Sequence, residues 1–132
     1  MRTLLVADDN RLSRELVRDL FESADCRVVE AGSGQEVIDR LDAASPDLVL
    51  LDLEMPDKDG FATLVEIRNH PRFSDVPVMA VTAKAMLLDR DRIQAAGFDA
   101  YITKPIDIAK LRERVDELLH SSQKENAHER RR

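Results

Sequence analysis

Hydrophobic positions along this chain fall into two alternating patterns, short apolar runs and longer stretches with helical spacing. The short runs are rich in aliphatic and β-branched residues and occupy residues 3–7, 27–31, 47–51, 77–81 and 100–102. They are apolar without strict alternation, which is typical of parallel strands buried on both faces. The pattern therefore predicts five strands of one parallel sheet.

After each strand, apolar residues recur every three or four positions, the period of a helix with one buried face. Asn10 and Gly97 are suitable caps for the start of the first helix and the end of the fourth, which we expect near residues 86–96. The predicted buried stripes of the other four helices are Leu12, Leu16, Leu20 and Phe21; Val37, Ile38 and Leu41; Phe61, Leu64, Val65 and Ile67; and Leu111, Val115, Leu118 and Leu119. Five strand–helix units predict a doubly wound α/β fold with right-handed crossovers.

Composition limits the class of protein. The chain has 132 residues, of which 43% are hydrophobic and 35% charged, so we expect one globular domain. The longest apolar runs are far too short to span a bilayer, and the first residues do not form a secretory signal. A single cysteine, Cys26, excludes an internal disulfide. These features predict a cytoplasmic protein that does not enter a membrane.

Charge and periodicity change near the C-terminus. Apolar periodicity is lost after Leu119, so we expect a domain at residues 1–120 and a disordered tail at 121–132. The net charge of −6 argues against a nucleic-acid-binding protein. The tail ends in three arginines without interleaved aromatic residues, and we interpret it as a solvated extension.

Polar residues follow the predicted strands at their carboxyl ends. Asp8 and Asp9 follow the first strand, Asp52 the third, Thr82 the fourth, and Lys104 the fifth. In doubly wound folds the carboxyl ends of parallel strands meet at one edge of the sheet, where ligands bind. We therefore expect three carboxylates, a hydroxyl and an ammonium in one crevice.

Three neighbouring carboxylates repel one another unless a cation is bound, and Mg²⁺ suits a site with few protein ligands and several waters. Asp9 is predicted to bind the metal directly and Asp8 to act through water. Asp52, on the central strand, is the natural nucleophile for forming an acyl phosphate. Lys104 and Thr82 would balance the charge of the phosphoryl group.

These residues resemble the receiver domains of two-component response regulators. The resemblance covers residues 3–119 and implies a flavodoxin-like sheet with strand order 2-1-3-4-5. The matching segments are VADDN at 6–10, LLDLEMP at 50–56, Gly60, VTA at 81–83, Ala96-Gly97 and YITKP at 101–105.

The resemblance implies a phosphoryl-accepting site. Asp52 would receive its phosphoryl group from a sensor histidine kinase or a histidine phosphotransfer protein. Mg²⁺ would be held by Asp9, Asp52 and the backbone carbonyl of Glu54. Lys104 would contact the phosphoryl group, and the Lys104-Pro105 bond would be cis, as in many relatives.

The resemblance also implies a switch. Thr82 and Tyr101 match the pair in which the hydroxyl moves toward the phosphoryl group and the ring turns inward. Glu54 and Lys84 match two positions that flank the path of the attacking water. We expect an ion pair between them to block that path and to lengthen the lifetime of the phosphoryl group.

The leading interpretation is a stand-alone receiver that catalyses only its own phosphorylation and dephosphorylation. Its output would be a protein-interaction face formed by the fourth helix, the fifth strand and the fifth helix. At the start of the fourth helix, Met86, Leu87 and Leu88 either close over the core and the loop after Thr82, or leave at least one side chain exposed to anchor a partner or a second receiver. The sequence leaves open the cognate kinase, the downstream target and homodimerisation on phosphorylation.

Other interpretations are less favoured. A receiver cut from a hybrid kinase or a multidomain regulator would have the same residues. A Mg²⁺-dependent aspartyl-phosphate phosphohydrolase would use Glu54 as its second acid, but that class needs a cap domain and does not explain Lys104-Pro105. A mononucleotide-binding flavodoxin needs a phosphate-cradling loop where this chain has Asp8-Asp9-Asn10. An inactive receiver is disfavoured because all the chemical residues are present.

Overall fold

Strands and helices alternate along the whole chain. In a computed structural model, residues 1–83 and 87–130 are described, with side chains described for residues 1–83 and 90–120. The elements are β1 (Arg2–Ala7), α1 (Arg11–Phe21), β2 (Cys26–Ala31), α2 (Gly34–Ala44), β3 (Leu48–Asp52), α3 (Gly60–Asn69), β4 (Val78–Thr82), α4 (Leu87–Ala96), β5 (Ala100–Thr103) and α5 (Ile108–Arg130).

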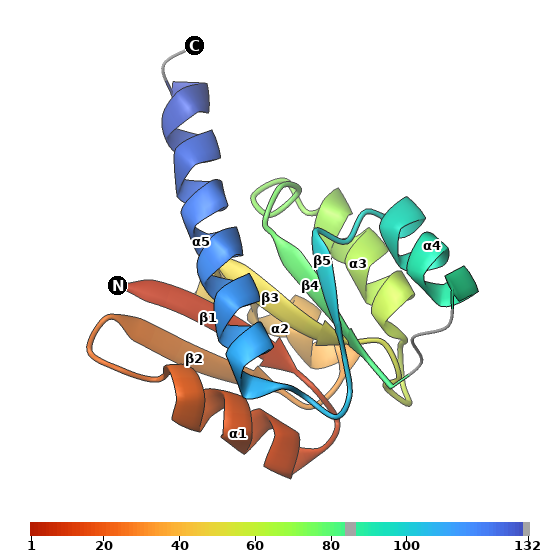
Figure 1. Ribbon diagram of the computed structural model, residues 1–132. Helices are drawn as coiled ribbons and strands as arrows, with labels where there is room; N and C mark the ends of the chain where they lie inside the picture. The colour runs from red at the N-terminus through yellow and green to blue at the C-terminus, as the bar shows by residue number, and fades with distance from the viewer. Residues whose placement is uncertain (84–86, 131–132) are drawn as a thin grey trace.

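The five strands form one parallel sheet in the order β2-β1-β3-β4-β5. Helices α1 and α5 cover one face of this sheet, and α2, α3 and α4 cover the other (Figure 1). Every residue of β3 and β4 is buried. The predicted doubly wound α/β fold and the flavodoxin-like strand order are confirmed.

Two hydrophobic cores lie on opposite sides of the sheet. Successive side chains of a strand point to opposite faces. On β3, Leu48 and Leu50 therefore pack in the core under α1 and α5, while Val49 and Leu51 pack in the core under α2, α3 and α4. This double burial explains why the strands are apolar without alternation.

The predicted buried stripe of α1 is partly wrong. Leu12 is 75% exposed and Leu16 is also exposed, whereas Val17 is buried and Leu20 and Phe21 are half-buried. The inward face of this helix is set by Val17 and the positions one turn away from it, so the first two leucines lie on the solvent side. Val65 of α3 is exposed for the same reason, on the side of the helix opposite the core.

The C-terminal helix is longer than the sequence predicts. Helix α5 continues to Arg130, whereas loss of apolar periodicity predicts a disordered tail from residue 121. Gln, Lys, Glu and Ala in this stretch have good helix propensity even without a face to bury. The domain boundary at residue 120 stays a prediction.

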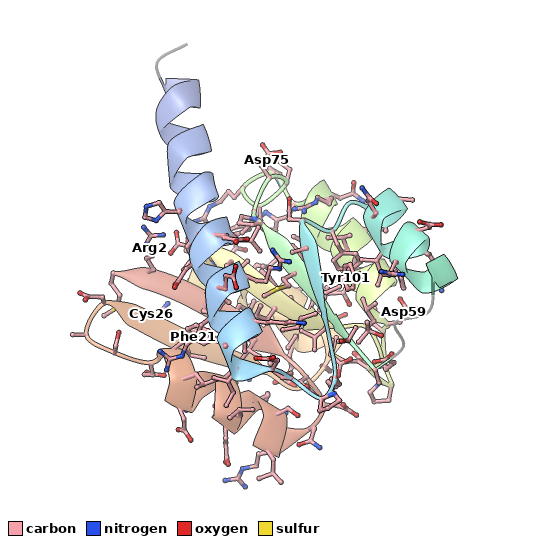
Figure 2. All side chains as sticks on the ribbon, viewed as in Figure 1. Arg2, Phe21, Cys26, Asp59, Asp75 and Tyr101 are labelled. Atoms are coloured by element: carbon pink, nitrogen blue, oxygen red, sulfur yellow. The ribbon has the colours of Figure 1, made fainter. Side chains whose placement is uncertain are left out.

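Local signals at several loops and termini agree with the structure. Asn10 caps α1 by accepting a hydrogen bond from the backbone N–H of Ser13. Asp59, labelled in Figure 2, caps α3 by accepting the backbone N–H of Ala62. Gly97 has a φ of 102°, in the left-handed region that follows a helix. The Lys104-Pro105 peptide bond is cis. In the described part of the chain no helix is long and apolar enough to cross a membrane.

Candidate functional site

Three acidic side chains meet at the carboxyl edge of the sheet. Asp8, Asp9 and Asp52 each offer a carboxylate oxygen, and these oxygens lie within 4.8 Å of one another. Asp8 is 4% exposed and Asp52 is 2% exposed, while Asp9 is exposed to solvent. Hard oxygen ligands beside an opening to water are the donor set that Mg²⁺ prefers, so these residues fit the predicted metal.

One ammonium group joins two of these carboxylates across the sheet. Lys104 Nζ lies 3.1 Å from Asp8 Oδ2 and 3.0 Å from Asp52 Oδ2. Burial alone would lower the pKa of Lys104, but the hydrogen bonds to Asp52 and Asp8 outweigh it and raise that pKa above its ordinary value of 10.5. Lys104 is therefore a permanent cation beside the buried carboxylates.

Backbone groups hold the other oxygens of these two carboxylates. Asp8 Oδ1 accepts the N–H of Asn10 at 2.9 Å, and Asp52 Oδ1 accepts the N–H of Glu54 at 2.9 Å. The Arg14 guanidinium donates to the backbone carbonyl of Asp8 at 2.7 Å. Both buried carboxylates are thus fixed in orientation, because each of their oxygens has a donor.

Glu54 contacts the end of the neighbouring strand. Its Oε1 accepts the Thr82 hydroxyl at 2.7 Å, and its Oε2 accepts the backbone N–H of Ala83 at 3.4 Å. Thr82 is 1% exposed. The sequence predicts the backbone carbonyl of Glu54 at the metal but gives no signal for these side-chain contacts. Lys84, its predicted ion-pair partner, lies outside the described residues, so that pair stays a prediction.

The loop between β3 and α3 is tied to helix α2 by a residue that the sequence did not single out. Asp57 accepts the backbone N–H groups of Gly34 and Gln35, each at 3.1 Å, at the start of α2. The hydrogen bond from Gln35 is the main cause of the lowered pKa of Asp57. A loop aspartate gives no sequence signal for such a cap, because the helix lies 22 residues away in the chain.

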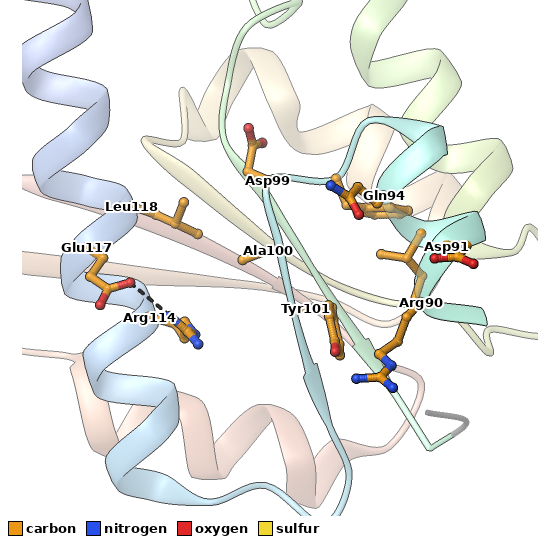
Figure 3. Close-up of a pocket in the computed structure, with 11 residues that line it drawn as sticks. Arg90, Asp91, Gln94, Asp99, Ala100, Tyr101, Arg114, Glu117 and Leu118 are labelled. Atoms are coloured by element: carbon orange, nitrogen blue, oxygen red, sulfur yellow. Dashed lines mark hydrogen bonds and ion pairs between the residues drawn. The ribbon is translucent and has the colours of Figure 1, made fainter. Parts of the chain in front are cut away.

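Tyr101 lies beside a surface cavity, away from the acidic cluster. It pairs with Ala80 in the sheet, whereas Thr82 pairs with Thr103. The cavity, of about 620 Å³, opens over β5 between α4 and α5 and is lined by Tyr101, Arg90 and Arg114 among others (Figure 3). Met86 and the side chains of Leu87 and Leu88, the predicted anchors on this face, lie outside the described residues.

Comparisons with known proteins place the chain in a family. The model of the response regulator receiver domain matches residues 4–116. The polar-differentiation response regulator DivK of Brucella ovis is 33% identical over 118 residues, which span 89% of this chain and 96% of that protein.

Solved structures agree with this placement. A putative response regulator from Chloroflexus aurantiacus is 28% identical with a TM-score of 0.83, covering 90% of this chain and 98% of that one. The receiver domain of a sensor histidine kinase from Pseudomonas aeruginosa, solved with a magnesium ion coordinated in its active-site cleft, is 26% identical with a TM-score of 0.81, covering 90% and 98%. This chain belongs to the response regulator receiver domain family of two-component signalling.

Proposed function

We propose that this receiver accepts a phosphoryl group on Asp52 from a phosphohistidine of a sensor kinase or phosphotransfer protein. The observation that carries the proposal is the position of Asp52, buried at the end of the central strand between the Lys104 ammonium and the acidic edge that fits Mg²⁺. An oxygen of Asp52 attacks phosphorus, the P–N bond breaks, and its electron pair leaves with the imidazole, which then takes a proton.

The chain's own groups prepare this transfer. Lys104 already lies 3.0 Å from Asp52 and provides a fixed positive charge for the added phosphoryl oxygens. The Thr82 hydroxyl, at the end of the adjacent strand, is a donor for the same group. Asp9, Asp52 and the Glu54 carbonyl would hold Mg²⁺, which supplies charge neutralisation at the transferring phosphoryl group.

The protein donor needs a surface beside the site on which to bind. Leu12 lies in the first turn of α1, three positions after Asp9, and its side chain is largely exposed. An exposed leucine at this position offers apolar contact to the helical domain that carries the donor histidine. With such a phosphorylated donor, Leu12→Ser should slow transfer, and Val65→Ser, which changes another exposed apolar residue on α3, should not.

Output would pass through the face formed by α4, β5 and α5. Tyr101 is half-buried there and packs against the core, so a ring that turns inward would change the surface of the neighbouring cavity. Thr82 and Tyr101 act as the switch pair in this proposal. The chain performs no turnover on other substrates.

Intact-mass measurement with acetyl phosphate tests the proposal. The wild-type chain should gain one phosphoryl group when Mg²⁺ is present and none when it is chelated. Asp52→Asn removes the nucleophile and should gain none under either condition. Equal labelling of Asp52→Asn, or steady hydrolysis of phosphate esters by the wild type, would contradict the proposed function.

A further inference from the structure

The site contains an acidic side chain that belongs neither to the carboxylate cluster nor to the nucleophile. Glu54 contacts the ends of two adjacent strands, β3 and β4. Its backbone N–H donates to Asp52 Oδ1, while its carboxylate accepts from Thr82 and Ala83. The same residue therefore touches the nucleophile and the groups opposite it.

The two donors that Glu54 binds form a small anion site. The Thr82 hydroxyl and the Ala83 backbone N–H are successive groups at the end of β4, and each contacts a different oxygen of one carboxylate, at 2.7 Å and 3.4 Å. Any oxyanion at this position can accept hydrogen bonds from this hydroxyl and this backbone amide, so two oxyanions would compete for the same donors. The Glu54 carboxylate occupies the position at present.

We propose that Glu54 is an internal competitor of the phosphoryl group, an inference that rests on the proposed phosphorylation of Asp52. Before transfer, its carboxylate holds the Thr82 hydroxyl and the Ala83 amide. A phosphoryl group on Asp52 takes these donors, and the carboxylate moves out into solvent. Part of the binding free energy of the phosphoryl group is used to displace Glu54.

Charge adds to this competition. The described acidic cluster of Asp8, Asp9 and Asp52 has Lys104 as its cation, and the carboxylate of Glu54 brings one more negative charge to the same edge of the sheet. A phosphoryl group would enter against this charge until Glu54 moves away. The consequence is a receiver that accepts a phosphoryl group more slowly, and binds its analogues more weakly, than its Asp52, Lys104 and Thr82 would otherwise allow.

Glu54 is exposed to solvent, so replacing it should leave the fold intact. Glu54→Ala removes both the charge and the acceptor, whereas Glu54→Gln removes the charge and keeps an acceptor oxygen for Thr82. Glu113→Gln, at an exposed position of α5, changes the net charge equally and is the matched control.

Binding of beryllium fluoride, a phosphoryl analogue that coordinates a carboxylate oxygen, tests the proposal. Affinity is measured by calorimetry with saturating Mg²⁺. In Glu54→Ala, beryllium fluoride no longer has to displace the charge-assisted hydrogen bond of the Glu54 carboxylate, so it should bind about tenfold more tightly than in the wild type. Glu54→Gln should show a smaller gain in affinity. Glu113→Gln should match the wild type.

The amide resonance of Ala83 gives a second readout without any ligand. It should shift upfield in Glu54→Ala, because the N–H loses its carboxylate acceptor, and should be unchanged in Glu113→Gln. Unchanged or weaker analogue binding by both Glu54 variants would overturn the competitor role while leaving the phosphoacceptor role intact. Absence of analogue binding by the wild type and every variant would overturn the proposed function, and this inference with it.

Discussion

Replacing Lys104 with methionine removes the cation between two buried carboxylates. Asp8 and Asp52 are each less than 5% exposed, and Lys104 Nζ lies about 3 Å from both. Methionine keeps much of the length of the lysine stem and its apolar contacts, so the change mainly removes charge. The two carboxylates then face each other without their shared donor.

The expected loss of stability follows from this burial. Removing one partner of a buried ion pair costs about 3–5 kcal/mol, because the remaining charge stays desolvated. The Lys104 side chain is 27% exposed, so water screens part of the interaction. We therefore expect a loss of about 2–3 kcal/mol at pH 7 without Mg²⁺, which lowers the urea midpoint by about 1–2 M.

Urea unfolding followed by circular dichroism measures this effect. Lys110→Met, at an exposed position of α5, is the matched control and should unfold close to the wild type. Mg²⁺ should restore more stability to Lys104→Met than to the wild type, since it supplies the missing positive charge. If the two lysine variants unfold at the same urea concentration, the carboxylates are not held by Lys104 as the structure indicates.

Three further predictions concern the loops around the site. The pKa of Asp57 in the folded protein is lowered from its ordinary value of 3.8. The ionised carboxylate therefore stabilises the fold at pH values above 3.8, and this stabilisation is lost as the pH falls through the lower pKa of the folded state. Asp57→Asn should therefore have a lower thermal midpoint than the wild type at pH 7, and this difference should shrink at low pH. A difference between the two thermal midpoints that stays constant below pH 3.8 would contradict the prediction. Gly34→Ala should cost about 1–3 kcal/mol in urea unfolding, because a Cβ there would lie 2.5 Å from Thr63 Oγ1; a wild-type midpoint would show that the contact relaxes freely. Lys84→Ala should speed loss of the phosphoryl group. The test compares the autodephosphorylation rates of the wild type, Lys84→Ala, Glu54→Ala and the double variant. Additive effects, or slower loss, would exclude an ion-pair gate.

Much of the fold can be predicted from the sequence because β1, β3 and β4 are largely apolar runs that end in, or are followed by, a polar residue. The same rule brings Asp8, Asp52 and Lys104 together, since parallel strands place their carboxyl ends at one edge. The end of each apolar run marks the end of a strand, so the positions of these residues follow from the sequence pattern.

Side-chain partners across loops could not be predicted in this way. Leu12 fits an apolar stripe by spacing, yet the rotation of α1 on the sheet turns it to solvent. The contacts of Glu54 with Thr82 and of Asp57 with Gly34 depend on loop paths that no periodicity encodes. These contacts are set by tertiary packing, which the sequence pattern leaves unspecified.

Chemical mapping of the modified residue tests whether Asp52 carries the phosphoryl group. After treatment with acetyl phosphate and Mg²⁺, borohydride reduces an aspartyl phosphate to homoserine, which peptide mass spectrometry can locate. We expect homoserine at Asp52 and unreduced aspartate at Asp8 and Asp9. Homoserine at either of those positions, or phosphate on a histidine or serine instead, would contradict it.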